Sequence, residues 1–176
     1  MKIFACIFIL FVSSFCNLGY SGEVLLSSTP VLTYFSPNGG CTEAVVKSID
    51  ESTESVKVQA YSFTSRPIAE ALVRAKKRGD KVIIILDKSQ PTAKGSMMNY
   101  VISADVETYI DKAHAIAHNK IIIIDSRKVI TGSFNFTKSA EEKNAENMLV
   151  IDSKELANQY LDNFVEHKNH SIKCTN

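Results

Sequence analysis

Four consecutive isoleucines at positions 121–124 constrain the fold of this chain more than any other feature. β-branched side chains favour strands, and a strand without a polar position is buried on both of its faces. Such a strand lies inside a sheet that helices cover from both sides. Apolar runs alternate with helical patterns along the chain, so we expect an α/β layered domain with a central, mostly buried mixed β-sheet flanked by helices.

Hydrophobic periodicity and helix-ending residues predict the other elements. We expect strands at 31–36, 56–63, 82–86, 106–110, 121–125, 128–131 and 148–151. We expect helices at 42–51, 66–78, 97–103 and 154–167. Thr42 is a plausible N-cap of the first helix, and Gly79 ends the second.

Polar residues with a spacing of two surround the isoleucine strand. Because strand side chains alternate, His118 and Lys120 should point to the same face. Ser133 and Asn135 share this spacing, which indicates a second pair on a neighbouring strand. An imidazole, an ammonium, a hydroxyl and a carboxamide would then converge. This set suits a phosphodiester, since an imidazole can attack phosphorus while the other groups hold the non-bridging oxygens.

At these residues the chain resembles the phospholipase D superfamily, whose signature is H-x-K-x4-D followed by G-S-x-N. Here the signature reads His118, Lys120 and Asp125, with Ser133 and Asn135 downstream. Segments 34–37, 60–64, 75–79 and 134–138 resemble the short bacterial endonucleases of that superfamily. The similarity covers nearly everything after residue 30 and implies a phospholipase D-like fold.

The resemblance also implies a mechanism and the roles of individual residues. His118 is the nucleophile and forms a phosphohistidine, Lys120 and Asn135 are catalytic, and Ser133 helps them to bind the substrate phosphate. Glu146 occupies the place of a carboxylate that hydrogen-bonds the catalytic histidine. No metal or other cofactor is implied. Superfamily members with two signatures build one site between them, so the single signature here implies a homodimer or half a site.

Asp125 belongs to the signature but should lie outside the chemistry. It is an odd number of residues from both His118 and Lys120, so on an uninterrupted strand it faces away from them. The resemblance also assigns this aspartate a structural role.

The first 21 residues are typical of a cleaved signal peptide. Lys2 supplies a positive end, and residues 3–12 form an uncharged apolar run. The run is short for a membrane span, so we expect no stable span after cleavage. Residues 22–176 would then form a single phospholipase D-like phosphodiesterase domain that is periplasmic or secreted, in a bacterium.

The charge of the chain is balanced. It has 20 basic and 19 acidic residues, and removal of Lys2 with the signal leaves 19 of each. Balance argues against broad electrostatic capture of nucleic acid, so phosphate affinity must be local. The basic residues at 74 and 76–78 lie in the last turn of a predicted helix, where cations complement the helix dipole. Lys88 and Lys94, on a predicted loop, are better placed to touch a substrate backbone.

The remaining cysteines and histidines give weaker signals. Cys41 and Cys174 remain after signal cleavage and either pair in an oxidising compartment or stay free. His114 and His118 have the spacing of a helical zinc pair, but the local pattern is extended, so we interpret His114 as an isolated loop histidine. His167 and the following His170 lie in a polar tail and should be solvated. We therefore expect no metal site.

Together these observations predict an exported, metal-independent phosphodiesterase. The expected activity is that of an endonuclease on DNA, with RNA as a further candidate substrate. A phospholipase D-type lipid hydrolase uses the same chemistry and stays open, although the sequence shows no amphipathic membrane helix. A non-catalytic phosphate or nucleic-acid binding module is the third alternative. The complete set of His118, Lys120, Asn135 and Glu146 argues against it, because binding alone does not require a nucleophile.

Overall fold

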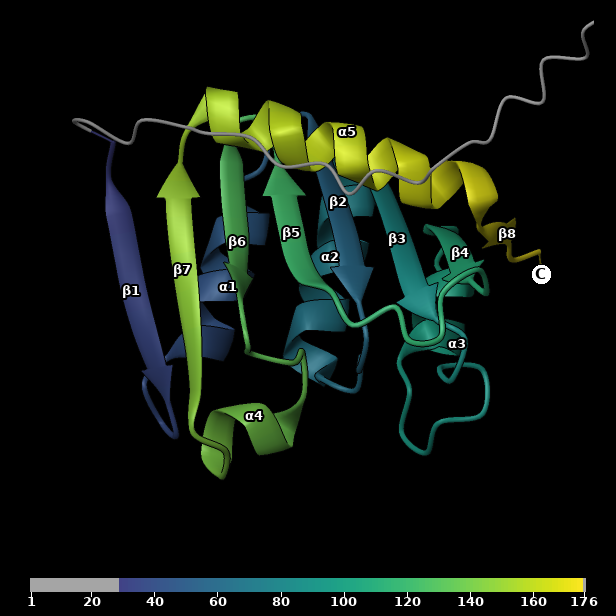
Figure 1. The fold of residues 1–176 in the computed structure, drawn as a ribbon, viewed down its shortest axis with the longest axis horizontal. Coiled ribbons are helices and arrows are strands. Elements are labelled where there is room, and N and C mark those ends of the chain that lie inside the picture. The colour runs from purple at the N-terminus through teal and green to yellow at the C-terminus, as the bar shows by residue number, and fades with distance from the viewer. Residues whose placement is uncertain (1–28, 176) are drawn as a thin grey trace, which may run out of the picture.

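The protein, described by a computed structural model for residues 29–175, is built on one mixed β-sheet (Figure 1). Its strands are β1 (Val31–Ser36), β2 (Ser55–Ala60), β3 (Lys81–Asp87), β4 (Glu107–Asp111), β5 (Lys120–Ile124), β6 (Lys128–Gly132), β7 (Glu146–Asp152) and β8 (Ile172–Lys173). Their spatial order is β1-β7-β6-β5-β2-β3-β4-β8. β2, β3 and β4 run parallel, whereas every other neighbouring pair is antiparallel. The predicted fold class is confirmed.

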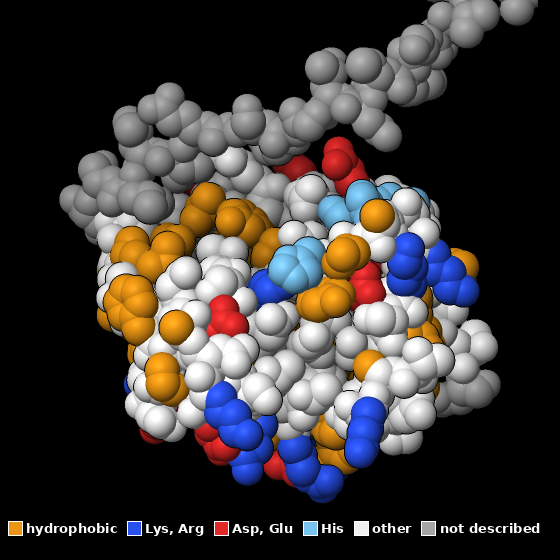
Figure 2. Space-filling view, turned by 60° about the horizontal axis from the view of Figure 1, so that its bottom comes forward, with side chains coloured by type: hydrophobic (Ala, Val, Ile, Leu, Met, Phe, Trp, Pro, Cys, Tyr) orange, Lys and Arg blue, Asp and Glu red, His pale blue; other side chains and the backbone are white. Residues whose placement is uncertain are grey.

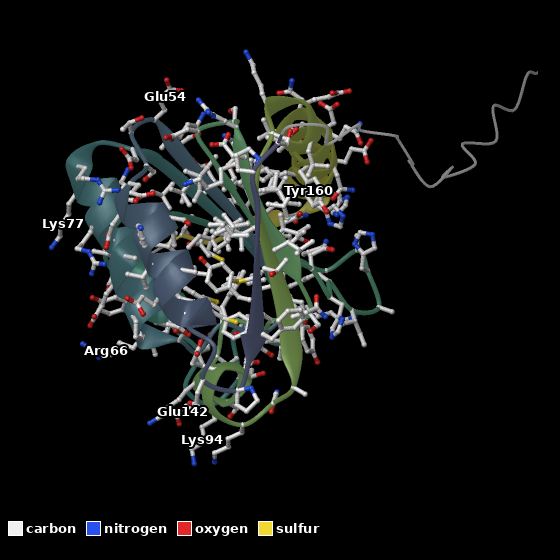
Figure 3. All side chains as sticks on the ribbon, turned by 90° about the vertical axis from the view of Figure 1, so that its left-hand side faces the viewer. Glu54, Arg66, Lys77, Lys94, Glu142 and Tyr160 are labelled. Carbon is white, nitrogen blue, oxygen red and sulfur yellow. The ribbon has the colours of Figure 1, made fainter. Side chains whose placement is uncertain are left out.

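Helices cover both faces of the sheet. They are α1 (Cys41–Asp50), α2 (Arg66–Arg78), α3 (Met98–Ile102), α4 (Lys138–Glu142) and α5 (Lys154–His170). α1 and α2 lie behind the sheet in Figure 1, and α5 crosses its front; the side view in Figure 3 shows the sheet between them. The side chains of the isoleucine strand β5 point alternately to the two faces of the sheet. Ile122 and Ile124 belong to the core on the α1 and α2 side, and Ile121 and Ile123 pack in the core with Phe164 of α5. Burial of this strand on both faces is confirmed.

Tertiary contacts change some of the predicted boundaries. The N-cap of α1 is Gly40 and not Thr42. The carboxylate of Glu141 in α4 caps this helix instead, accepting hydrogen bonds from the backbone N–H groups of Gly40 (3.1 Å) and Thr42 (2.7 Å). A cap that comes from a residue about 100 positions away leaves no local sequence signal. The short elements α4 and β8 were not predicted, and α5 continues three residues beyond its predicted end.

Cys41 and Cys174, the cysteines within residues 29–175, are both free. Cys41 opens α1, which packs against β1 at one edge of the sheet, and the Cys174 N–H donates to Thr108 of β4 near the other edge. β1 and β4 are six strand spacings apart, roughly 29 Å, whereas a disulfide needs Cα atoms within about 7 Å. A bridge within one chain is therefore excluded. Burial raises the pKa of the Cys41 thiol to about 11, so this group is no nucleophile at neutral pH.

The predicted signal peptide, residues 1–21, lies outside the described residues. Between residues 29 and 175, no helix combines the length and the apolar character that crossing a membrane requires.

Candidate active site

The predicted site residues gather at one end of the sheet, the lower end in Figure 1. β2 and β6 end there, and β5 and β7 begin there. The register places Ala60 of β2 opposite Lys120 of β5. It also places Gly132 of β6 opposite Met148 of β7. Residues that flank these four strand ends are therefore neighbours in space, although they are up to 85 positions apart in the chain.

His118 and Lys120 lie together at the start of β5. The Lys120 ammonium donates a 2.7 Å hydrogen bond to the backbone oxygen of His118, and Lys120 as a residue is only 7% exposed. Burial lowers the pKa of Lys120, and the carboxylate of Glu146 opposes this shift. The His118 side chain is exposed. The ammonium is thus held beside an imidazole that remains accessible to a substrate.

Tyr61 completes this part of the site, although the sequence predicts no site role for it. Its ring centroid is 4.6 Å from that of His118 and 5.1 Å from the Lys120 ammonium nitrogen. The backbone N–H of Tyr61 also donates to the Asn119 oxygen at 3.0 Å. A sequence signal existed, because Tyr61 lies within the predicted strand 56–63; in the structure this strand, β2, ends at Ala60 and pairs with β5. Only the register shows that the ring meets His118.

Ser133 and Glu146 form the second part of the site. The Ser133 hydroxyl donates a 2.6 Å hydrogen bond to Glu146, and Asn144 donates to the other carboxylate oxygen at 3.1 Å. The Ser133 oxygen in turn accepts from the backbone N–H of Asn147 at 3.1 Å. This network fixes the hydroxyl and the carboxylate relative to one another.

Asn135 lies in the segment that follows β6. Phe134 and Phe136 are buried on either side of it and anchor the segment in the core. Within residues 29–175, the Asn135 Oδ1 atom is buried and has no hydrogen-bond partner. Unpaired buried acceptors are uncommon, and a catalytic or binding role is one of the explanations for them.

One expected contact is not formed within the single chain. Glu146 bonds Ser133 and Asn144, and no hydrogen bond found for the described residues joins it to His118. The orienting role that the resemblance implies for Glu146 is therefore not seen in this arrangement.

Asp125 lies at the opposite end of β5. Its carboxylate accepts hydrogen bonds from the backbone N–H groups of Thr53, Glu54 and Ser55 at 2.8–3.0 Å. The strand ends at Ile124, and Asp125 has a φ of 51°. The alternation of side chains along a strand therefore does not determine the direction in which Asp125 points. The five residues of β5, spanning roughly 16 Å, separate it from His118.

The interpretation of the other three histidines is wrong. His114, His167 and His170 do not lie apart in solvent, because all three surround the carboxylate of Asp111. α5 brings its last turn back to the end of β4, and β8 pairs with β4 immediately afterwards. A sequence signal was available, since Asp111 with His114 and His167 with His170 are both pairs spaced by three.

The chain is similar to known proteins in sequence and in fold. The family model described as "Cardiolipin synthase, PLD-like domain" matches residues 45–168. A protein named phospholipase D from Rickettsia conorii is 46% identical over 143 residues, which cover 81% of this chain and 72% of that protein. The mitochondrial cardiolipin hydrolase of Xenopus tropicalis is 30% identical over 110 residues, 62% of this chain and 52% of the relative.

Among solved structures, Nuc from Salmonella typhimurium, described as a phospholipase D family member, superposes with a TM-score of 0.81 at 38% identity. The match covers 84% of this chain and 99% of Nuc. NucT from Helicobacter pylori superposes with a TM-score of 0.76 at 25% identity, covering 83% of this chain and 99% of NucT. The chain therefore belongs to the phospholipase D superfamily and is a phosphodiester hydrolase of that superfamily.

Proposed function

We propose that this protein is an exported endonuclease that hydrolyses DNA through a phosphohistidine intermediate, in a site shared by two identical subunits. The observation that carries the proposal is the placement of an exposed imidazole beside a buried lysine, His118 beside Lys120. A polymer backbone can reach an exposed imidazole without entering a closed pocket. The resemblance to the short bacterial endonucleases of the superfamily supports the same substrate.

The chemistry requires two histidines with different roles. His118 of one subunit forms a bond to phosphorus while the P–O bond to the leaving group breaks, and the leaving oxygen takes a proton from the partner's His118. The partner's His118, now neutral, removes a proton from water, and the resulting hydroxide breaks the P–N bond. Lys120 and Asn135 stabilise the charge on the non-bridging oxygens, so no step requires a metal ion.

The surface around the site supports association with a second copy. Phe35 is 66% exposed on β1 and Ile116 is 57% exposed two residues before His118. Figure 2 shows hydrophobic side chains on both sides of a histidine on this face. Large exposed apolar side chains around a polar centre are typical of an interface. A two-fold axis beside His118 would cover them and supply the second imidazole.

Phospholipid is the second candidate substrate. The observation in its favour is the name of the Rickettsia relative, phospholipase D, at 46% identity. Lipid hydrolysis would use the same residues, so the two candidates differ only in what the surrounding surface binds.

Substrate preference is tested by incubating the protein with plasmid DNA, RNA and phosphatidylcholine vesicles, each with the His118→Ala variant as the blank. We expect nicking of plasmid DNA that His118→Ala abolishes, and initial rates that excess EDTA leaves unchanged. Release of choline without any cleavage of nucleic acid would replace the nuclease proposal with the phospholipase alternative. Loss of the rate with EDTA, and its return with magnesium, would contradict the mechanism.

The shared site is tested by co-folding wild type with a fourfold excess of His118→Ala. Random pairing leaves about one fifth of wild-type chains with a wild-type partner, so the activity per wild-type chain should fall about fivefold. The matched control is an equal excess of Ser139→Ala, an exposed position on α4, which should leave total activity proportional to total protein. Light scattering that shows a fully active monomer at the assay concentration would refute the shared site.

A further inference from the structure

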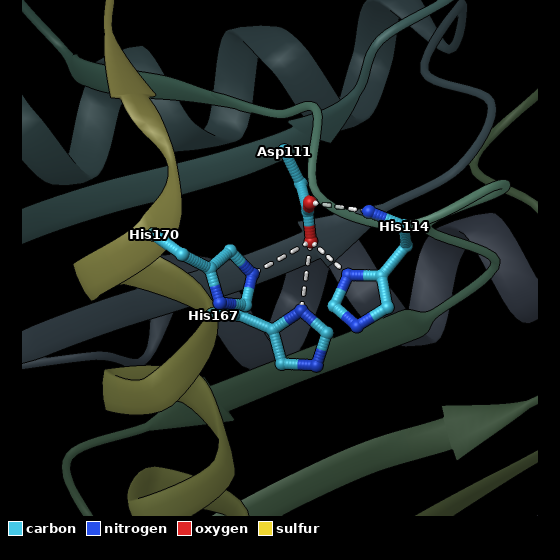
Figure 4. A group of neighbouring side chains, drawn as sticks. All are labelled: Asp111, His114, His167 and His170. Carbon is cyan, nitrogen blue, oxygen red and sulfur yellow. Dashed lines mark hydrogen bonds and ion pairs between the residues drawn. The ribbon is translucent and has the colours of Figure 1, made fainter. Parts of the chain in front are cut away.

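Four potential metal ligands from separate parts of the chain meet at the end of β4 (Figure 4). Asp111 is the last residue of β4, and His114 lies in the loop that follows. His167 and His170 occupy the final turn of α5, where a spacing of three places them on the same side of the helix. The chain contains four histidines, so this cluster uses every one except His118.

Three imidazole nitrogens lie within hydrogen-bond distance of one carboxylate oxygen in this cluster. The Asp111 Oδ2 atom is 2.9 Å from His114 Nδ1, 2.9 Å from His167 Nδ1 and 3.2 Å from His170 Nε2. All four ligand atoms lie within 4.8 Å of one another. Zinc bonds of about 2.1 Å place tetrahedral ligand atoms about 3.4 Å apart, so small side-chain rotations suffice.

The carboxylate is oriented as in a metal site. The side chain of Asp111 is fully buried. Its Oδ1 atom accepts hydrogen bonds from the backbone N–H groups of Ala113 (3.0 Å) and His114 (3.4 Å). These bonds leave Oδ2 alone to face the three imidazoles. Hydrogen bonds that hold one oxygen and direct the other to the ion are the usual support of a metal-binding carboxylate.

We propose that Asp111, His114, His167 and His170 bind a structural zinc ion. Three imidazole nitrogens and one carboxylate oxygen select zinc and related transition metals over magnesium or calcium, which prefer oxygen ligands. Four protein ligands complete the tetrahedron and leave no position for a substrate or a reactive water, so the ion is structural and not catalytic.

The ion would connect the C-terminal helix to the segment that leads into the active site. That segment, residues 112–119, follows Asp111 and ends with His118 and Asn119. It is also held without the ion, because the Ala117 N–H donates to Asp87 at 2.7 Å and the Lys88 ammonium donates to the His114 oxygen at 3.0 Å. Removal of zinc should therefore lower thermal stability while His118 keeps its place and its activity.

The experiment uses the full chain, purified without a histidine tag and stripped with EDTA. Zn²⁺ and Co²⁺ are titrated back in competition with a chromogenic chelator, and thermal unfolding is followed with and without Zn²⁺. We expect about one zinc per chain, visible Co²⁺ bands of tetrahedral intensity, and a rise in Tm of about 5–10 °C when free zinc exceeds Kd a hundredfold. Mg²⁺ should give no shift.

The matched variants are His114→Gln and His118→Asn. The ring of His114 is 45% exposed, so its replacement leaves the fold intact while zinc affinity falls at least about tenfold. His118→Asn removes the one histidine outside the cluster and should bind zinc as the wild type does, although its hydrolytic activity is lost. A wild type that binds zinc no more tightly than His114→Gln, or equal losses of affinity in both variants, would overturn the proposal. Nuclease activity does not enter either readout, so failure of the proposed function would leave this test unaffected.

Discussion

Ser133 and Glu146 are joined by a 2.6 Å hydrogen bond between residues 13 positions apart, at the point where β6 ends and β7 begins. The bond exists because these strands pair antiparallel, with Gly132 opposite Met148. The same hydroxyl accepts from the Asn147 backbone. One serine thus fixes both a carboxylate of the candidate site and the backbone beside it.

Ser133→Ala should therefore lower activity more than stability. We expect kcat/KM to fall roughly 10- to 100-fold, because Glu146 loses one of its two hydrogen-bond donors and the phosphate loses a hydroxyl partner. The free energy of unfolding should fall by about 1 kcal/mol. Steady-state kinetics and urea unfolding measure the two effects. Ser139→Ala on the exposed face of α4 is the control and should change neither quantity.

Gly132→Ala should unfold or strongly destabilise the protein. Gly132 has a φ of 151°, and an added Cβ would lie 2.3 Å from the Asn147 backbone oxygen and 2.9 Å from the Met148 Cα. Backbone atoms of a paired strand cannot move away without breaking hydrogen bonds of the sheet. We therefore expect the free energy of unfolding, measured by thermal unfolding, to fall by about 2 kcal/mol or more. Gly95→Ala is the control, because its φ is also positive, 77°, but no atom lies within 4 Å of the added carbon. Equal losses in both variants would show that the close approach has no role.

Asp125→Asn should lower stability and leave kcat unchanged. Burial alone would raise the pKa of Asp125, but hydrogen bonds from Ser55, Glu54 and Thr53 hold it below its ordinary value of 3.8. The folded pKa is thus depressed, and the ionised carboxylate stabilises the fold fully above pH 3.8. This contribution is lost as pH falls through the folded pKa.

The difference in unfolding free energy between wild type and Asp125→Asn, about 1–2 kcal/mol, should therefore be constant from pH 5 to 7 and shrink below pH 3.8. Chemical denaturation across this range measures it. A large fall in kcat in a variant of unchanged Tm would instead place Asp125 in the chemistry.

The fall of kcat/KM at high pH should report the loss of the proton from Lys120. Burial lowers its pKa from 10.5, while Glu146 acts in the opposite direction. Because the ammonium binds phosphate only when charged, kcat/KM should fall as pH rises through this lowered pKa. Glu146→Gln removes the opposing carboxylate and should move this fall to still lower pH, in addition to any loss of rate. A fall that stays at the same pH in this variant would show that another group is titrating.

The layered fold and the central strand were predictable from sequence, because both follow from local patterns. Four consecutive isoleucines strongly favour a strand that is covered on both faces, and in β5 their side chains are divided between two cores. The proximity of His118 and Lys120 was predictable for the same reason, since the two residues are neighbours in the chain. The resemblance to the phospholipase D superfamily rested on a short motif that needs no tertiary information.

The contacts that complete the candidate site depend on pairing between distant segments. Tyr61 meets His118 because β2 pairs with β5, and Glu141 caps α1 from a helix that was not predicted. The convergence of three histidines on Asp111 depends on where α5 ends relative to β4. Hydrophobic periodicity determines which face of an element is buried, but it does not specify which polar ends come together. That choice is made by strand order and register, which are properties of the whole packed sheet.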